Sequence, residues 1–118
     1  MKISDIKEIL EAEVICRADL LDTQVNAACG SDMMSDVLAY VKDQAVLMTG
    51  LVNAQVVRTA VMMDMNCIVF VRSKVPTAEM IELAEESGIV LLATSKRMYE
   101  ACGILYSNGL IGNRAKNV

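Results

Sequence analysis

The sequence is poor in aromatic residues, with one Phe, three Tyr and no Trp among 118 residues. Its core must therefore be aliphatic, which suits a chain that is 54% hydrophobic and contains nine Met. The length allows one domain and not two. A domain this small has too little interior to hide so much apolar surface. We therefore expect a homo-oligomer, most simply a homodimer, because two-fold closure is the commonest arrangement.

Histidine is also absent, which excludes an imidazole base or metal ligand. The sequence contains no nucleophile elbow, no P-loop and no G-x-G-x-x-G. Asp32 and Asp36 stand one helical turn apart and could in principle hold a metal, but a helix cap and a solvated acid are their expected roles. We therefore expect no enzyme, no metal and no cofactor.

The cysteines are few and widely spaced, without a C-x-x-C pair. A zinc site would have to be built from Cys ligands alone, without their usual spacing. Because cytosolic thiols stay reduced, we expect four buried free thiols instead, namely Cys16, Cys29, Cys67 and Cys102.

Long hydrophobic runs are missing, since none reaches the ~18 residues needed to cross a bilayer. The opening segment MKISDIKEILEAE carries acids where a signal peptide has an uncharged core. A cytoplasmic protein without a membrane partner is expected. The net charge is −4, and residues 1–86 hold seven basic and fourteen acidic side chains. An acidic chain without a basic stripe is a poor nucleic-acid binder, so nucleic acid is not an expected partner.

What the sequence does contain is a regular alternation of short strands and helices. Helices are predicted over about 3–10 (with Ser4 as N-cap), 32–41, 53–65, 77–87 and 95–107, and strands over 12–16, 25–29, 45–49, 67–71 and 89–93. Strands that are apolar throughout and alternate with helices indicate a parallel sheet covered on both faces. The prediction is a single three-layer α/β domain over 1–110, with a mostly parallel sheet of about five short strands flanked by helices. A flexible C-terminal tail over 111–118 should follow it.

Two helices carry apolar residues whose placement matters. Met33, Val37, Leu38 and Val41 are expected on the inner side of the helix over 32–41. The stretch VVRTAVMMDM at 56–65 is apolar on nearly every side, whereas a helix that covers a sheet needs one apolar stripe. It is either squeezed between the sheet and another element or part of a subunit interface. We favour the interface, formed by Val57, Val61 and Met65 or their counterparts on the other side of the helix.

Polar residues gather where the predicted parallel strands end. Ligands of α/β proteins bind beyond these carboxyl ends, where helix N-termini offer backbone amides. Hydroxyls, a glycine and cations at this edge have the composition of a pocket for an anion, such as a phosphorylated small molecule or nucleotide. The alternative is that the polar residues are ordinary helix caps and the cations ordinary surface. The candidate ligand-binding residues are Ser31, Thr49, Gly50, Asn53, Arg72, Ser73, Thr94, Ser95 and Lys96.

Three segments together resemble the DRTGG domain family: GSDMMSDVLAYVK at 30–42, VPTAEMIELAEESGIVLLATS at 75–95 and MYEACGILYSNGL at 98–110. The family includes modules of phosphotransacetylases and of pyrophosphatases with CBS domains, as well as stand-alone proteins. It is related to the N-terminal domain of the HPr serine kinase. The resemblance implies a regulatory or ligand-sensing domain, often dimeric, without activity of its own.

The two loops that give the family its name differ in this sequence. The family has an Asp-Arg pair after one strand and Thr-Gly-Gly after the next. Here Gly50 is followed by Leu51 and Val52, and Val71 by Arg72 and Ser73. We therefore carry no family site over to this chain, and the candidate residues rest on the strand ends alone.

Two functions remain open. The first is a homodimeric, non-catalytic regulatory module that binds an anionic small molecule, or a partner protein, at the strand ends. The second is an adaptor or structural subunit that docks onto a partner enzyme through its apolar helix and binds no small molecule.

Overall fold

A computed structural model of the chain describes residues 1–40 and 44–111. The helices are α1 (Ile3–Ile9), α2 (Met34–Tyr40), α3 (Ala54–Met62), α4 (Ala78–Ser87) and α5 (Met98–Ser107), with a 3-10 turn η1 at Ala18–Leu20. The strands are β1 (Glu13–Cys16), β2 (Ala27–Gly30), β3 (Ala45–Thr49), β4 (Cys67–Phe70) and β5 (Val90–Ala93). The predicted α/β class is confirmed. Within the described residues, no helix is long and apolar enough to span a bilayer.

The strands form one sheet in the order β1-β5-β4-β3-β2. Strands β2 to β5 are parallel, as predicted, and β1 joins the edge antiparallel to β5, with a bulge between Val14 and Cys16. The register aligns Thr49 with Phe70 and Phe70 with Ala93. The carboxyl ends of β3, β4 and β5 therefore lie level at one edge of the sheet.

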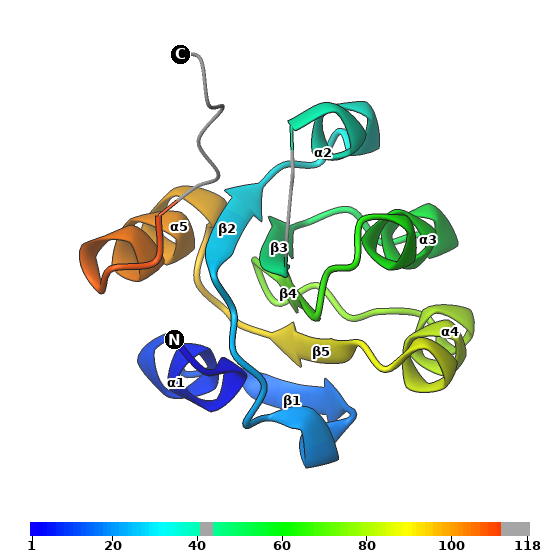
Figure 1. Cartoon of the computed structure of the whole chain (residues 1–118), viewed down its shortest axis with the longest axis horizontal. Coiled ribbons are helices and arrows are strands. Elements are labelled where there is room, and N and C mark those ends of the chain that lie inside the picture. Colours follow the sequence, from blue (N-terminus) through cyan, green and yellow to red (C-terminus); the bar gives the residue numbers. More distant parts are fainter. Residues whose placement is uncertain (41–43, 112–118) are drawn as a thin grey trace.

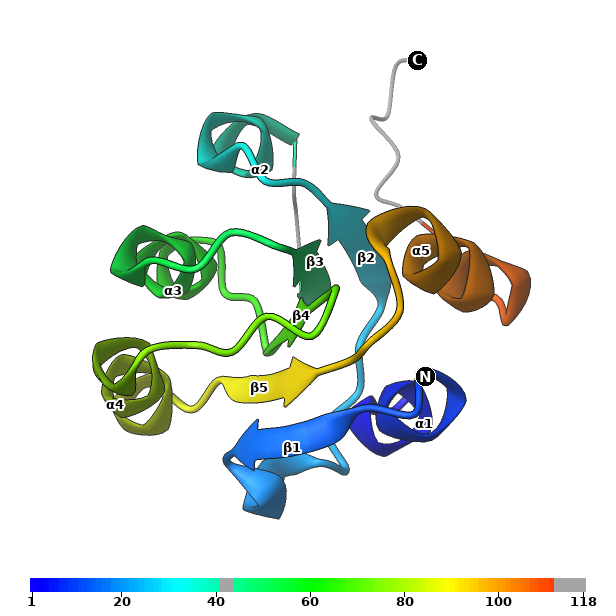
Figure 2. The ribbon, with the colours of Figure 1, turned by 180° about the vertical axis from the view of Figure 1, so that it is seen from behind.

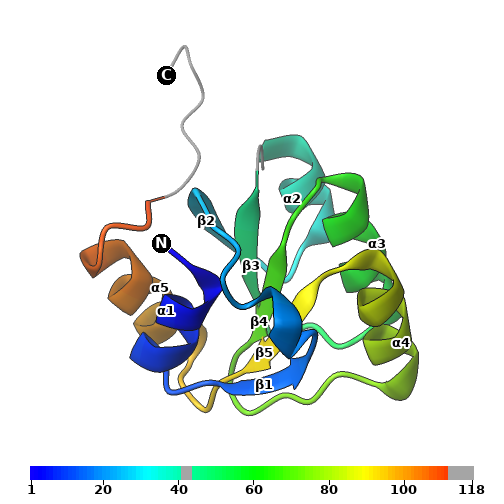
Figure 3. The same ribbon diagram turned by 60° about the horizontal axis from the view of Figure 1, so that its bottom comes forward.

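The helices cover the sheet on both faces, which makes three layers (Figure 1). Helices α2, α3 and α4 pack on one face, while α1 and α5 pack on the other, a division that is equally clear from behind (Figure 2). Because β2 to β5 succeed one another across the sheet, their three connecting helices lie side by side on one face. The chain changes face after β5, so that α4 and α5 leave neighbouring strands in opposite directions (Figure 3).

The core consists of two aliphatic layers separated by the sheet. Every residue of β3 and β4 is buried, because both strands are covered on both faces. Side chains alternate between the layers: Leu47 and Ile68 face α2–α4, whereas Met48 and Val69 face α1 and α5. Phe70 is fully buried in the first layer. The near absence of aromatic residues is thus met by Val, Ile, Leu and Met, as the composition predicts.

The predicted starts of two helices were wrong. Helix α1 begins before Ser4: its N-cap is Lys2, whose backbone N–H donates to Asp5 Oδ2 at 3.0 Å. Helix α5 begins at Met98 and not at Ser95. Thr94 delays it, because its hydroxyl accepts from the Lys96 N–H at 3.3 Å and donates to the Leu10 carbonyl at 2.8 Å. Residues 95–97 are thereby held as a loop.

Helix α2 buries fewer of its apolar residues than expected. Val37 is fully buried, but Met33 and Leu38 are 60% and 41% exposed, so these two were wrongly placed on the inner side. Met34 takes the second inner position. Val41 lies outside the described residues, as does the predicted tail except for Ile111. The Ile111 carbonyl accepts from the Ala28 N–H at 3.1 Å, which ties this residue to the outer edge of β2.

Candidate functional site

The nine predicted ligand residues all lie at the carboxyl edge of the parallel strands, which we call the carboxyl edge. Ser31 follows β2, Thr49 ends β3, and Gly50 and Asn53 come before α3. The remaining residues come from the two loops that leave in opposite directions: Arg72 and Ser73 after β4, and Thr94, Ser95 and Lys96 after β5.

Two of the predicted hydroxyls are buried and already bonded. Thr49 is fully buried; its Oγ1 donates to Asp32 Oδ1 at 2.9 Å and accepts from the Leu51 N–H at 3.1 Å. Thr94 is 3% exposed and joins Leu10 to Lys96 through its hydroxyl. These side chains hold the loops in place and have no room for a ligand.

Two further predicted residues act as local caps. The Asn53 Oδ1 accepts from the Gln55 N–H at 2.9 Å and so caps α3, as Asn does at many helix starts. The Ser31 Oγ accepts from the Met33 N–H at 3.0 Å, just before α2. Both side chains are accessible. To bind a ligand, however, either side chain would have to give up the hydrogen bond by which it caps the local backbone.

Asp32 belongs to this edge, although sequence reasoning expected it to be a cap of the helix over 32–41. Its Oδ1 reaches across to the next strand and accepts from the Gly50 N–H at 2.8 Å as well as from Thr49. The Gly50 bond lowers the pKa of Asp32, with smaller contributions from Thr49 and from the Arg72 charge, against a partly opposing effect of burial. Asp32 is 17 positions from Thr49 and 18 from Gly50, and no sequence pattern indicates hydrogen bonds over such separations.

The turn after β4 is the most unusual backbone of the edge. Arg72 and Ser73 both have left-handed φ angles, 59° and 57°, a conformation that favours glycine. Their N–H groups donate to the Lys96 and Thr94 carbonyls at 2.8 and 2.9 Å, so this turn is fastened to the loop after β5. The Arg72 guanidinium lies directly over Gly50, where any Cβ would overlap it.

The carboxyl edge carries more positive than negative charge. Arg72, Lys74, Lys96 and Arg97 stand here, while the exposed Asp32 has one carboxylate oxygen bonded to the edge itself. Lys96 Nζ is 4.0 Å from Glu11 Oε1, at the limit of an ion pair. The N-cap of α5, Arg97, supplies no side-chain acceptor, so the first N–H groups of this helix are not capped. Their partial positive charge adds to that of the cations.

The predicted interface residues are divided between core and surface. Val57 is fully buried on the face of α3 that lies against the sheet, and Met65, between α3 and β4, is 3% exposed and packs in the same core layer. Both residues therefore belong to the chain's own core. Val61 is 44% exposed, and its neighbour Met62 is 69% exposed, so the accessible part of the stretch lies at the carboxyl end of α3. The interface itself stays a prediction.

The cysteines offer no reactive site among the described residues. All four are free thiols, but only Cys16 and Cys67 are buried; Cys29 and Cys102 are half-buried, so the prediction of burial was wrong for these two. Burial raises the pKa of each one, most strongly that of Cys67, so the thiolate is disfavoured. Within residues 1–40 and 44–111, no three His, Cys, Asp or Glu side chains cluster as metal ligands.

Two hollows of about 480 and 460 Å³ lie away from the predicted ligand residues. The first is at the opposite edge of the sheet, where β4 and β5 begin, and Val61 and Met65 are among its lining residues. The second lies between α1 and the segment after α5. Neither hollow includes a residue of the carboxyl edge. A ligand at the carboxyl edge would therefore bind to the surface loops, outside both hollows.

A family model, the DRTGG domain, matches residues 5–107. The chain belongs to the DRTGG domain family. Among solved structures it is similar to the regulatory region of a Clostridium perfringens pyrophosphatase, solved with its CBS and DRTGG domains in complex with the activator diadenosine tetraphosphate. The TM-score is 0.69 at 14% identity, and the match covers 99% of this chain and 52% of that one. This DRTGG chain thus spans about half the length of that structure. No curated protein matches the sequence.

The turn after β4 has a backbone geometry that glycine adopts without steric cost, since Arg72 and Ser73 are both left-handed. This chain places a guanidinium and a hydroxyl on that turn. The loop after Thr49, with Leu51 and Val52, carries no charge.

Proposed function

We propose that this DRTGG domain is a non-catalytic regulatory module that senses an anionic small molecule, phosphorylated or a nucleotide, at the carboxyl edge. The observation that carries the proposal is the left-handed Arg72–Ser73 turn fastened to the Lys96 loop. Backbone strain of this kind is kept where the surrounding structure over-determines it, and it concentrates at functional sites. The turn joins the backbones of two residues with cationic side chains, Arg72 and Lys96.

The position of this pair fits the general rule for ligand sites in open α/β sheets. Such sites lie where connections leave neighbouring strands toward opposite faces. Here that point is between β4, which leads to α4, and β5, which leads to α5. Arg72 and Ser73 stand on one side of it, and Lys96 with the uncapped start of α5 on the other. An anion placed between them would meet the backbone amides of α5, and would draw toward it the Arg72 guanidinium, which lies over Gly50, and Lys96 Nζ, which lies 4.0 Å from Glu11 Oε1.

The family supports the regulatory part of the proposal. The similar pyrophosphatase region is regulatory and binds a nucleotide activator, although at 14% identity the likeness shows the fold alone. The hydroxyls of Thr49 and Thr94 are occupied in backbone and carboxylate bonds, which leaves them unsuited to act as nucleophiles. We assign no chemistry to this edge, in keeping with a sensing role.

The test is a thermal-shift and calorimetric screen with pyrophosphate, ATP, ADP and diadenosine tetraphosphate. A ligand at a hundred times its dissociation constant stabilises a domain by about 2.7 kcal/mol, a shift of several degrees at this size. Arg72→Ala and Lys96→Ala should each weaken binding at least tenfold. The matched control is Lys2→Ala, because Lys2 pairs with Gln24, near the start of β4 at the opposite edge. Absence of any shift, or full binding by both variants, would refute the proposal.

A second candidate, an adaptor without a small-molecule ligand, is favoured by one observation. Val61 and Met62 at the end of α3 are accessible apolar residues, and Leu38 of the neighbouring α2 is 41% exposed. An adaptor would bind a purified partner enzyme in a way that Met62→Asp abolishes and Lys96→Ala does not. For a sensing module we expect the opposite result in the anion screen: Lys96→Ala weakens anion binding and Met62→Asp does not.

A further inference from the structure

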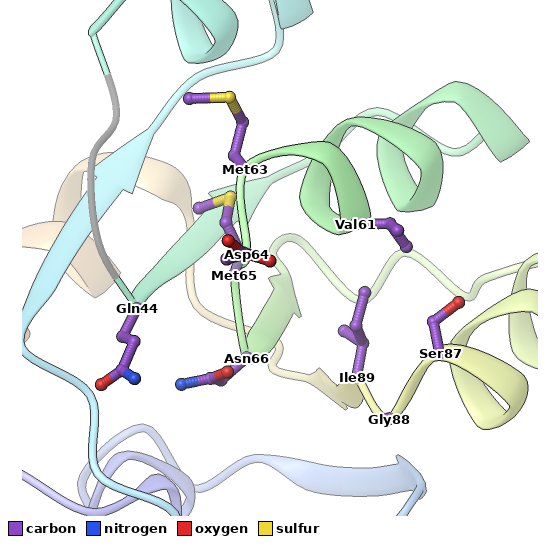
Figure 4. A pocket seen from close by; sticks show the side chains of 9 residues that line it. All are labelled: Gln44, Val61, Met63, Asp64, Met65, Asn66, Ser87, Gly88 and Ile89. Carbon is purple, nitrogen blue, oxygen red and sulfur yellow. The ribbon is translucent and has the colours of Figure 1, made fainter.

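The hollow of about 480 Å³ at the amino edge of the parallel strands is unrelated to the carboxyl edge (Figure 4). Its walls come from the ends of α3 and α4 and from the residues just before β3, β4 and β5. A volume in this range accommodates a small organic molecule and is far larger than a metal ion requires.

The lining combines polar acceptors with an apolar wall. Gln44 and Asn66 present their amides on one side, and Ser87 stands on the other, with Asp64 and Ile89 between them (Figure 4). The apolar part includes Met65 and Ile89, at 3% and 2% exposure, and the accessible Val61. Among the lining residues, Asp64 is the sole charged group.

Asp64 has both a backbone conformation and a charge that are unfavourable at its position. It follows the last turn of α3 with a left-handed φ of 53°, where glycine is the usual residue. Its N–H donates to the Val61 carbonyl at 3.2 Å, so its carboxylate stands at the negative end of the helix dipole. Neither α3 nor α4 has a basic residue in its last turn to offset this charge.

The end of α4 already attracts a guanidinium from within the chain. Arg17, itself outside the lining, donates through Nη1 to the Glu85 carbonyl at 2.7 Å and approaches Gly88 from the far side. Arg17 also forms an ion pair with Asp19, at 3.0 Å between Nη2 and Oδ2. This contact shows that the carbonyl end of α4 accepts a planar cation, while the Asp64 side of the same wall has no such group among the described residues.

We propose that this hollow binds a small organic cation, an aliphatic amine or guanidine, with its head at Asp64 and its methylene stem along Met65 and Ile89. The bound cation would neutralise the carboxylate and the carbonyl end of α3, while Arg17 already bonds to the end of α4. The amide oxygens of Gln44 and Asn66 supply further acceptors for its N–H groups. The site is separate from the anion site, and neither proposal depends on the other.

The experiment is titration of the isotopically labelled chain with agmatine and with putrescine, followed by amide chemical shifts and calorimetry. Shift changes should centre on residues 61–66 and 87–89. Asp64→Asn, which keeps a residue tolerant of the left-handed conformation, should weaken binding at least tenfold. The control Glu8→Gln removes another exposed carboxylate, on α1, and should bind as the wild type does. Circular dichroism and melting establish that both variants are folded.

Three outcomes would overturn the proposal. The first is no shift at these residues at millimolar agmatine or putrescine. The second is equal binding by Asp64→Asn and wild type. The third is equal binding of butanol, an uncharged analogue of the stem, which would assign the hollow to apolar contact alone. An arginine-containing tripeptide is included as a further arm; binding of the peptide without agmatine would place the cation on a partner protein and refute a small-molecule site.

Discussion

A single carboxylate, Asp32, joins the end of β2 to the end of β3. It accepts from Gly50 N–H and from Thr49 Oγ1, so that two neighbouring loops share one acceptor. The same residue stands close enough to Arg72 for that charge to lower its pKa further. The carboxyl edge is therefore pre-organised by an anion of the chain itself, close to the Arg72 cation.

Asp32→Asn should lower the free energy of unfolding by about 0.5–1 kcal/mol at pH 7. A bond to a charged acceptor is worth more than this, but solvent screens an exposed carboxylate. Because the folded pKa is depressed, the stabilisation is fully present above the unfolded pKa of about 3.9 and is lost as pH falls through the lower folded value. Urea unfolding of both proteins from pH 3 to 7 measures this. A difference that stays constant to pH 3 would contradict the assignment.

At the scale of the element, the turn after β4 holds two left-handed residues in succession. Ser73→Gly should raise the stability by about 1 kcal/mol, since glycine adopts this conformation without a Cβ clash, and so raise Tm by a few degrees. Ser95→Gly is the matched control: Ser95 is also an exposed loop serine of this edge but has no left-handed φ, so glycine there should be neutral or destabilising. Equal effects from the two variants would show that the Ser73 conformation costs nothing.

Sequence reasoning predicted the positions of the helices and strands well. It predicted less well which side of a helix faces the core. The strands at 45–49 and 67–70 fall where the apolar runs predict them, since fully buried strands leave an unbroken signal. The inner and outer sides of α3 could not be separated, because its exposed Val61 and its buried Val57 are the same residue type. Position in the third dimension alone distinguishes them.

The carboxyl edge was predicted from topology, and its internal bonds were not. That parallel strands gather their carboxyl ends together is a property of the fold class, so the candidate residues share one edge. Which hydroxyls are used up depends on contacts between distant segments, such as Thr94 with Leu10, 84 positions apart. The left-handed Arg72 and Ser73 carry no sequence signal, because neither is a glycine.

At the scale of the whole molecule, the three helices α2, α3 and α4 all run from the carboxyl edge to the amino edge of the sheet. Their dipoles point the same way, with amide ends beside Arg72 and carbonyl ends beside Asp64. The cation Arg72 stands at the amide ends and the acid Asp64 at the carbonyl ends, although Asp32 also lies at the first edge and Arg17 at the second. The two proposed ligand classes, an anion and an organic cation, thus match opposite ends of one polarised layer.

The predicted homodimer can be tested by the mass of the molecule in solution. If the accessible apolar residues of α2 and α3 form the contact, sedimentation at micromolar concentration should give twice the 12.8 kDa chain mass. Met62→Asp should return the mass to one chain, because a buried unpaired charge disfavours association. Tyr106→Asp, on α5 in the opposite layer, is the control and should leave the dimer intact. A monomeric wild type would disprove the prediction. A substitution of Val57 would not test the interface, because this residue is buried within the chain.

The antiparallel pairing of β1 with β5 has a consequence for the order of folding. Strands β2 to β5 can add one after another as the chain proceeds, since each pairs with its successor. Strand β1 precedes all of them and pairs only with the last, so its ladder closes the longest loop in the sheet. The apolar face of α1, with Ile3, Ile6 and Leu10, has no cover from Val90 and Leu92 until then. During synthesis we expect this segment to contact only nearby residues such as Leu21 and Val25 until β5 is made.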